Sequence, residues 1–87
     1  MYWEDVGFLK ASKNRLKIFQ ELSKGERTPK ELQVALNLHF SQISMILKEL
    51  VDRELVICRN VDFRKGKIYA LSEKGEEIKK SVLKVGY

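Results

Sequence analysis

The sequence predicts a mainly α-helical domain with one small β-hairpin. Apolar residues recur at helical spacing from the N-terminus to about Leu55. Between residues 55 and 71 the spacing changes to that of two short strands separated by a glycine-containing turn. Helical spacing returns after Ser72. The expected order is helix, helix, short strand, helix, helix, two strands, helix, in one domain over residues 1–87.

Composition limits the classes of function. The 87 residues carry a net charge of +5, and 44% are hydrophobic, which is typical of a globular protein with a polyanionic partner or a membrane-surface partner. One cysteine and one histidine exclude an internal disulfide and a His–Cys metal cluster, so no metal or cofactor is expected. No catalytic set can be assembled, and an enzyme is not expected. Without an apolar run of membrane-spanning length or a signal-peptide pattern, a cytoplasmic protein that does not bind membranes is expected.

Two helices are expected before the central segment. In the first, Trp3, Val6 and Leu9 recur at helical spacing. They either pack on the domain's own core or form a dimer contact. A second helix over residues 13–24 is capped by Ser12 and followed by a stub of strand near residues 26–27.

Residues 28–55 predict two helices joined by a tight turn. Thr28 and Glu31 form a capping box around Pro29, which suits the first helical position. Asn37 breaks the pattern and tolerates the left-handed backbone of a turn. A longer apolar stripe then follows at Ile43, Ile46, Leu47, Leu50 and Val51. Helix, turn, longer helix is the helix-turn-helix pattern, whose second helix enters the DNA major groove.

The predicted hairpin concentrates positive charge. Its strands cover residues 55–61 and 67–71, and the turn 62–66 contains Gly66. The hairpin cations are Arg59, Arg64, Lys65 and Lys67, opposed only by Asp62. A basic hairpin beside a helix-turn-helix favours a phosphate-contacting or minor-groove loop over a merely solvated one. Cys58 lies in the first strand and is expected to be buried, with a redox role left open.

The last helix begins after its predicted cap, Ser72. Its thin apolar seam, Ile78 and Val82, either packs on the core or contacts a second copy. The candidate dimer interface therefore comprises Trp3, Val6, Leu9, Ile78 and Val82.

Several motifs carry a resemblance to a known family. They are Ile43-Ser44 with Leu47 and Leu50, Leu55-Val56, the run KGKIY at residues 65–69, and Leu71 with Gly75. Over residues 12–75 the chain resembles winged-helix regulators of the ArsR and MarR type, and is most similar to the small archaeal members. The resemblance implies a winged helix-turn-helix fold and a DNA-binding transcription factor, usually a homodimer, with a recognition helix and a β-hairpin wing.

The chain departs from the family pattern at three positions. Asn37 and Glu54 stand where the family usually has glycine, and Met45 stands where it often has arginine or lysine. At Glu54 a residue other than glycine implies a strained backbone or a different turn. The Cys and His ligands of the metal-sensing members are absent, so metal sensing is not implied.

The candidate DNA-binding residues follow from the helical spacing of about 100° per residue. With Ile43, Leu47 and Leu50 buried, the outward face comprises Ser41, Met45, Lys48 and Asp52. Gln42 and Ser44 flank this face, whereas Phe40 is expected to turn towards the core. Gln42 is suited to adenine, and Met45 to a thymine methyl group. The full predicted set is Lys30, His39, Ser41, Gln42, Ser44, Met45, Lys48, Arg59, Arg64, Lys65 and Lys67.

The predicted function is that of a sequence-specific transcriptional regulator that binds double-stranded DNA, and a homodimer is expected. The alternative is a protein–protein interaction module in a transcription or RNA-processing complex. Its support is the exposed Met45 and the absence of formal charge between Leu32 and Leu47.

Overall fold

The computed structural model describes residues 3–60, 62 and 66–84. In this part of the chain the elements are α1 (Trp3–Lys10), α2 (Lys13–Ser23), α3 (Pro29–Leu36), α4 (Phe40–Asp52), β1 (Val56–Cys58), β2 (Tyr69–Leu71) and α5 (Glu73–Lys84). This order confirms the predicted winged helix-turn-helix architecture. None of the described helices is long and apolar enough to cross a bilayer.

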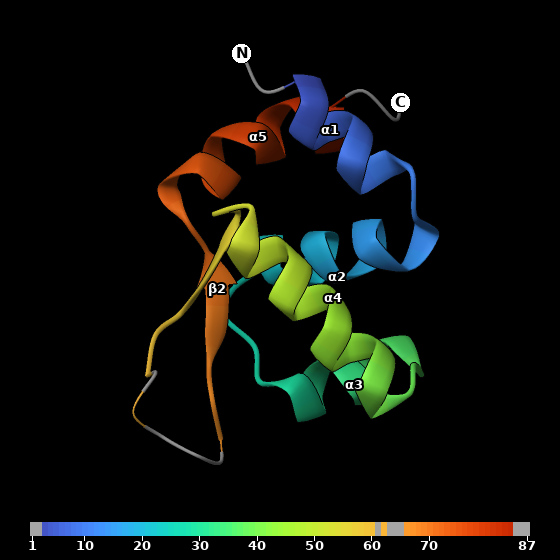
Figure 1. Cartoon of the computed structure of the whole chain (residues 1–87), viewed down its shortest axis with the longest axis vertical. Helices are drawn as coiled ribbons and strands as arrows, with labels where there is room; N and C mark the ends of the chain where they lie inside the picture. The colour runs from blue at the N-terminus through green and yellow to red at the C-terminus, as the bar shows by residue number, and fades with distance from the viewer. Residues whose placement is uncertain (1–2, 61, 63–65, 85–87) are drawn as a thin grey trace.

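Helices lie at both ends of the molecule, and the hairpin runs along one side (Figure 1). Helices α1 and α5 pack together at one end, and α3 lies at the other. Helix α2 contacts every other helix and also β2, so it lies at the centre of the packing. Helix α4 extends from the α3 end towards the hairpin.

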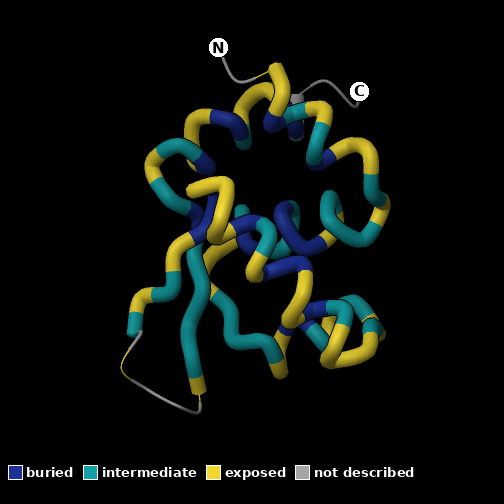
Figure 2. The backbone as a smooth tube through the Cα atoms, in the orientation of Figure 1, coloured by how far each residue is buried: buried dark blue, intermediate teal, exposed yellow. Residues whose placement is uncertain are grey.

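One hydrophobic core joins all five helices to the hairpin (Figure 2). Its buried members are Leu9, Ile18, Phe19, Leu22, Leu32, Ile43, Ile46, Leu47, Leu50, Leu55, Val56, Leu71, Ile78 and Val82. The predicted stripe of α4 is confirmed for four of its five residues. Val51 is the exception, with 37% of its surface exposed.

The predicted helix caps are present. The Ser12 hydroxyl accepts a hydrogen bond from the Arg15 amide, and the Ser72 hydroxyl accepts one from the Gly75 amide. At α3 the Thr28 amide donates to the Glu31 carboxylate at 2.8 Å, and the Glu31 amide donates to the Thr28 hydroxyl at 3.1 Å. These bonds satisfy amides that the first helical turns leave without partners.

The strands are shorter than predicted. Strand β1 pairs antiparallel with β2 from Val56↔Leu71 to Cys58↔Tyr69. Beyond this pairing one more backbone bond forms, in which the Arg59 amide donates to the Ile68 carbonyl at 2.8 Å. The Asn60 side chain then ends the ladder: it accepts from the Ile68 amide at 2.7 Å and donates to the Gly66 carbonyl at 3.0 Å. Val61 and the turn residues 63–65 lie outside the described residues.

The expected stub of strand before α3 is confirmed. Arg27 forms an isolated antiparallel bridge with Tyr69, with hydrogen bonds of 2.9 and 2.8 Å between their backbones. This bridge fixes the start of α3 beside the base of the hairpin.

Two residues occupy the left-handed region where the family usually has glycine. Asn37 has φ 55° and ends α3, and Glu54 has φ 63° in the turn after α4. The backbone therefore keeps the turn geometry and accepts the steric cost of a side chain at Glu54.

Three predicted dimer contacts are corrected by the packing. Leu9, Ile78 and Val82 are buried in the chain's own core, because α1 and α5 pack on each other and on α2. Their side chains are therefore not on the surface. Trp3 remains 74% exposed and Val6 is half-buried.

Candidate nucleic-acid interface

The outward face of α4 carries the side chains that the helical spacing predicted. Ser41, Ser44, Met45 and Lys48 are all exposed. Met45 is 61% exposed although it is apolar. This face combines hydroxyl groups, a thioether and one cation, which are groups able to contact base edges and phosphates.

The side chain of Gln42 is engaged within the protein. The backbone amide of His39, the N-cap residue of α4, donates to Gln42 Oε1 at 3.2 Å. A bidentate contact to adenine uses this same oxygen together with the amide NH₂ group. The predicted adenine contact would therefore compete with the cap of the helix.

Phe40 does not turn towards the core as predicted. It is 56% exposed. Helical spacing predicts that Phe40 points to the same side of α4 as Leu47. Phe40 is, however, the first residue of α4 and lies at its N-terminal end. Among the residues that the structure describes, its neighbours leave more than half of its surface uncovered, and the buried line begins with Ile43.

Phe40 lines a groove that joins α3, α4 and the hairpin. The groove has a volume of about 480 Å³ and is lined by Thr28, Pro29, Lys30, Phe40, Ser44, Leu47, Gly66, Lys67 and Tyr69. Of these residues, Lys30 and Lys67 are cationic and none is acidic. The spacing of residues in the sequence predicts only that the α4 members of the groove lie close together. The positions of the other members depend on how α3 and the hairpin pack against α4.

Tyr69 forms part of this groove from β2. Burial raises the pKa of the Tyr69 phenol above its ordinary value, and the electrostatic interaction with the neighbouring Cys58 adds to the effect. Tyr69 therefore stays neutral at physiological pH and offers a hydroxyl group. Cys58 is half-buried, which is less than expected, and its thiol lies 3.7 Å from Asn60 Oδ1.

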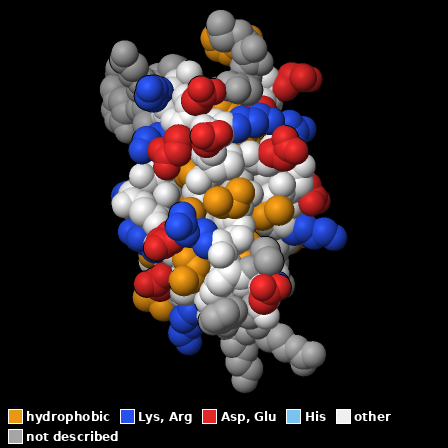
Figure 3. Space-filling view, turned by 90° about the vertical axis from the view of Figure 1, so that its left-hand side faces the viewer, with side chains coloured by type: hydrophobic (Ala, Val, Ile, Leu, Met, Phe, Trp, Pro, Cys, Tyr) orange, Lys and Arg blue, Asp and Glu red, His pale blue; other side chains and the backbone are white. Residues whose placement is uncertain are grey.

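The positive charge of the hairpin is partly offset. Arg59 Nε lies 3.2 Å from Glu26 Oε2, and both side chains are more than half exposed. Figure 3 shows the hairpin side of the molecule, where cationic, acidic and apolar side chains are mixed. Arg64 and Lys65 lie outside the described residues.

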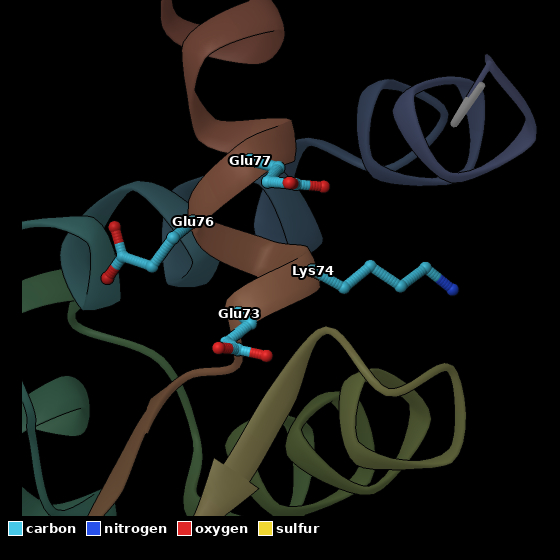
Figure 4. A pocket seen from close by; sticks show the side chains of 4 residues that line it. All are labelled: Glu73, Lys74, Glu76 and Glu77. Atoms are coloured by element: carbon cyan, nitrogen blue, oxygen red, sulfur yellow. The ribbon is translucent and has the colours of Figure 1, made fainter.

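The start of α5 carries a cluster of carboxylates that does not form a site. Figure 4 shows Glu73, Glu76 and Glu77 pointing in different directions around a shallow depression. Glu76 pairs with Lys79 at 3.1 Å, and Lys74 pairs with Asp5 at 3.1 Å. Within the described ranges, no group of three His, Cys, Asp or Glu side chains could hold a metal ion.

Several solved structures share this fold. A MarR family regulator from Neisseria meningitidis superposes with a TM-score of 0.78 at 19% identity, over 93% of this chain and 58% of that one. The present chain thus spans little more than half of that regulator's length. Reduced HlyU from Vibrio cholerae gives a TM-score of 0.74 at 27% identity, over 94% of this chain and 87% of that one.

A third solved structure is a homodimeric winged helix-turn-helix DNA-binding domain from Mycobacterium bovis, described as a possible ArsR-family transcriptional regulator. It gives a TM-score of 0.71 at 26% identity, over 92% of this chain and 72% of that one. No curated protein of matching sequence was found.

A family model described as winged helix-turn-helix matches residues 13–86, which is most of the chain. The match begins at the first residue of α2 and includes the capped α3, α4 and the hairpin. It therefore covers the same elements that form the groove and the exposed face of α4. The chain belongs to the winged helix-turn-helix family.

Proposed function

We propose that the chain is a sequence-specific transcriptional regulator that binds double-stranded DNA. Helix α4 enters the major groove, and the hairpin lies on the sugar–phosphate backbone or in the adjacent minor groove. The observation that carries this proposal is the groove that joins the start of α3, the recognition helix α4 and the hairpin into one face. Its cations lie beside the exposed, uncharged side chains of Ser41, Ser44 and Met45 on α4. Phosphate positioning and base reading require this kind of arrangement.

The contacts divide by chemistry. Base edges are contacted from the exposed face of α4, by Ser41, Ser44 and Met45. Phosphates are contacted by cations on three elements, with His39 at the start of α4 as a further phosphate contact. The cations are Lys30, Lys48, Arg59, Arg64, Lys65 and Lys67. Most of the affinity then comes from the margins of the face, and most of the specificity from its centre.

The regulator acts as a homodimer in the cytoplasm, without enzymatic activity and without a cofactor. The homodimeric state of the Mycobacterium bovis domain supports this part of the proposal. Two copies would present two recognition helices about one turn of DNA apart, on a site with two-fold symmetry. Trp3, 74% exposed on α1, is the strongest remaining candidate for the contact between copies. Sedimentation equilibrium of the wild type and of Trp3→Ala tests it, because the variant should sediment as a monomer.

Selection of bound duplexes from random DNA tests the function. The expected result is an enriched site with two-fold symmetry. Its affinity should fall steeply with salt, with a slope that decreases by about 1 for each phosphate-contacting lysine replaced by alanine. Lys30→Ala and Lys67→Ala are the variants to compare, with Lys10→Ala on α1, at the far end of the molecule, as the control. Absence of DNA binding at low salt would refute the proposal.

A second candidate is a protein–protein module in a transcription or RNA-processing complex. The exposed Met45 and the uncharged stretch from Leu32 to Leu47 favour it. Replacing Arg64, Lys65 and Lys67 together with alanine separates the two functions. DNA binding should be lost in a DNA-binding regulator, whereas binding to a protein partner should survive.

A further inference from the structure

We propose that Phe40 is a specificity-determining residue that recognises thymine by covering its 5-methyl group in the major groove. This inference rests on the proposed function, because it states which base one residue of the same DNA-binding face recognises. It assigns base recognition to an aromatic side chain at the start of α4, beside the hydroxyl and thioether groups on the outward face.

The exposure of Phe40 is the first observation. More than half of its surface is exposed (56%), although neighbouring positions on the same side of α4 are buried, Leu47 at 2% and Ile43 at 0%. An exposed phenyl ring at the first position of a recognition helix loses contact with water when a partner covers it, and this stabilises the complex. The ring therefore contributes to binding rather than to the core of the protein.

The surroundings of Phe40 identify the partner by charge. The ring shares its groove with Lys30 from α3 and Lys67 from the hairpin, and none of the described residues that line this groove is acidic. Ser44, one helical turn after Phe40, adds a hydroxyl group to the same groove. An apolar ring that shares a groove with two cations matches a duplex, whose phosphates flank a groove floor of base edges, better than it matches an acidic or an apolar protein surface.

The geometry of a duplex then limits what the ring can contact. Stacked bases present only their edges in the major groove, and among these edges only thymine carries an apolar group, the 5-methyl. A phenyl ring cannot donate or accept a conventional hydrogen bond, so it discriminates through this methyl group. Phe40 would therefore prefer thymine to cytosine at one position of each half-site.

The state of Gln42 strengthens this assignment. Its Oε1 accepts the His39 amide at 3.2 Å and holds the first turn of α4. The one side chain of α4 suited to bidentate adenine recognition is thus used for capping. The remaining base contacts are the serine hydroxyls and two exposed apolar groups, Phe40 and Met45.

The test replaces thymine with deoxyuridine, which removes the methyl group and leaves the hydrogen-bonding edge unchanged. The full chain is first used to select its site from random duplex DNA. Single thymines of that site are then exchanged for deoxyuridine, and affinity is measured for the wild type and for Phe40→Ala. Met45→Ala is the matched control, since it also removes an exposed apolar side chain from α4.

The wild type should bind about fourfold more weakly for each covered methyl group that is removed. Phe40→Ala should lose this sensitivity at one thymine of each half-site and keep it elsewhere, whereas Met45→Ala should keep it at that thymine. Unchanged sensitivity in Phe40→Ala, or a wild type that binds deoxyuridine duplexes equally well, would refute the inference and leave the proposed function standing. Failure of the wild type to bind any duplex would refute both.

Discussion

Arg53, the residue that follows α4, donates a hydrogen bond of 3.1 Å from its guanidinium to Asp5 of α1. Asp5 is 8% exposed, and its other carboxylate oxygen lies 3.1 Å from Lys74 Nζ on α5. The Arg53 guanidinium also lies over the Phe8 ring, 4.0 Å from its centroid. These contacts connect the C-terminal end of α4 to α1 and, through Asp5, to α5, and they hold α4 in place.

Replacing Asp5 with alanine should lower the free energy of unfolding by about 1–3 kcal/mol, because a nearly buried carboxylate that two cations share is removed. Urea denaturation followed by circular dichroism measures the change. Glu4→Ala is the control, since Glu4 is adjacent but exposed. Equal losses in the two variants would show that Asp5 stabilises the fold no more than an ordinary surface charge does.

Glu54→Gly should stabilise the protein. Glu54 has φ 63°, a backbone conformation that is unfavourable for a residue with a Cβ atom. Glycine relieves this cost but adds freedom to the unfolded chain, so a net gain of about 0.5–1 kcal/mol and a rise in Tm of a few degrees are expected. Asn37→Gly is the comparison, because Asn37 has a similar φ of 55° but asparagine tolerates it. Thermal unfolding should give the larger rise for Glu54→Gly, and a fall in Tm would contradict the strain at this turn.

Gly75→Ala should destabilise the fold. A Cβ atom at this position would clash with the carbonyl oxygen of Leu55, which accepts the Ser72 amide at 3.0 Å where α5 begins. Moving backbone to relieve the clash should cost about 1–3 kcal/mol. Gly7→Ala on α1 is a matched control: nothing lies within 4 Å of its added Cβ, so alanine should stabilise that helix slightly. Chemical denaturation should show changes of opposite sign in the free energy of unfolding of the two variants. An unchanged free energy of unfolding in Gly75→Ala would refute the close approach of Gly75 to Leu55.

Glu26→Gln should tighten DNA binding if the hairpin contacts phosphate. The Glu26 carboxylate pairs with Arg59 at 3.2 Å, and both groups are exposed, so removing the acid leaves Arg59 available to the backbone of DNA. A gain of about two- to fivefold is expected at low salt and should fade as salt screens the charges. Glu4→Gln changes the net charge equally but lies on α1, away from the hairpin. Titration of labelled duplex by fluorescence anisotropy compares them, and equal gains would mean that only net charge matters.

The secondary structure was predictable because its determinants are local. Thr28, Pro29 and Glu31 specify the start of α3 through bonds within one turn, and the spacing from Ile43 to Leu50 specifies which side of α4 is buried. The same local reasoning identified the helix-turn-helix and the hairpin after it. It overestimated the length of the strands, because the Asn60 side chain ends the ladder.

The sequence by itself determined the order of elements, their caps and the outward face of the recognition helix, since each depends on residues within a few positions of one another. Only the tertiary structure decided that Phe40 is exposed and that Leu9, Ile78 and Val82 belong to the core. It also joined Lys30 of α3 and Lys67 of the hairpin to Phe40 in one groove. Burial at a helix end and proximity between elements depend on which distant element covers a side chain. Helical periodicity indicates the buried side of a helix but not which element covers it.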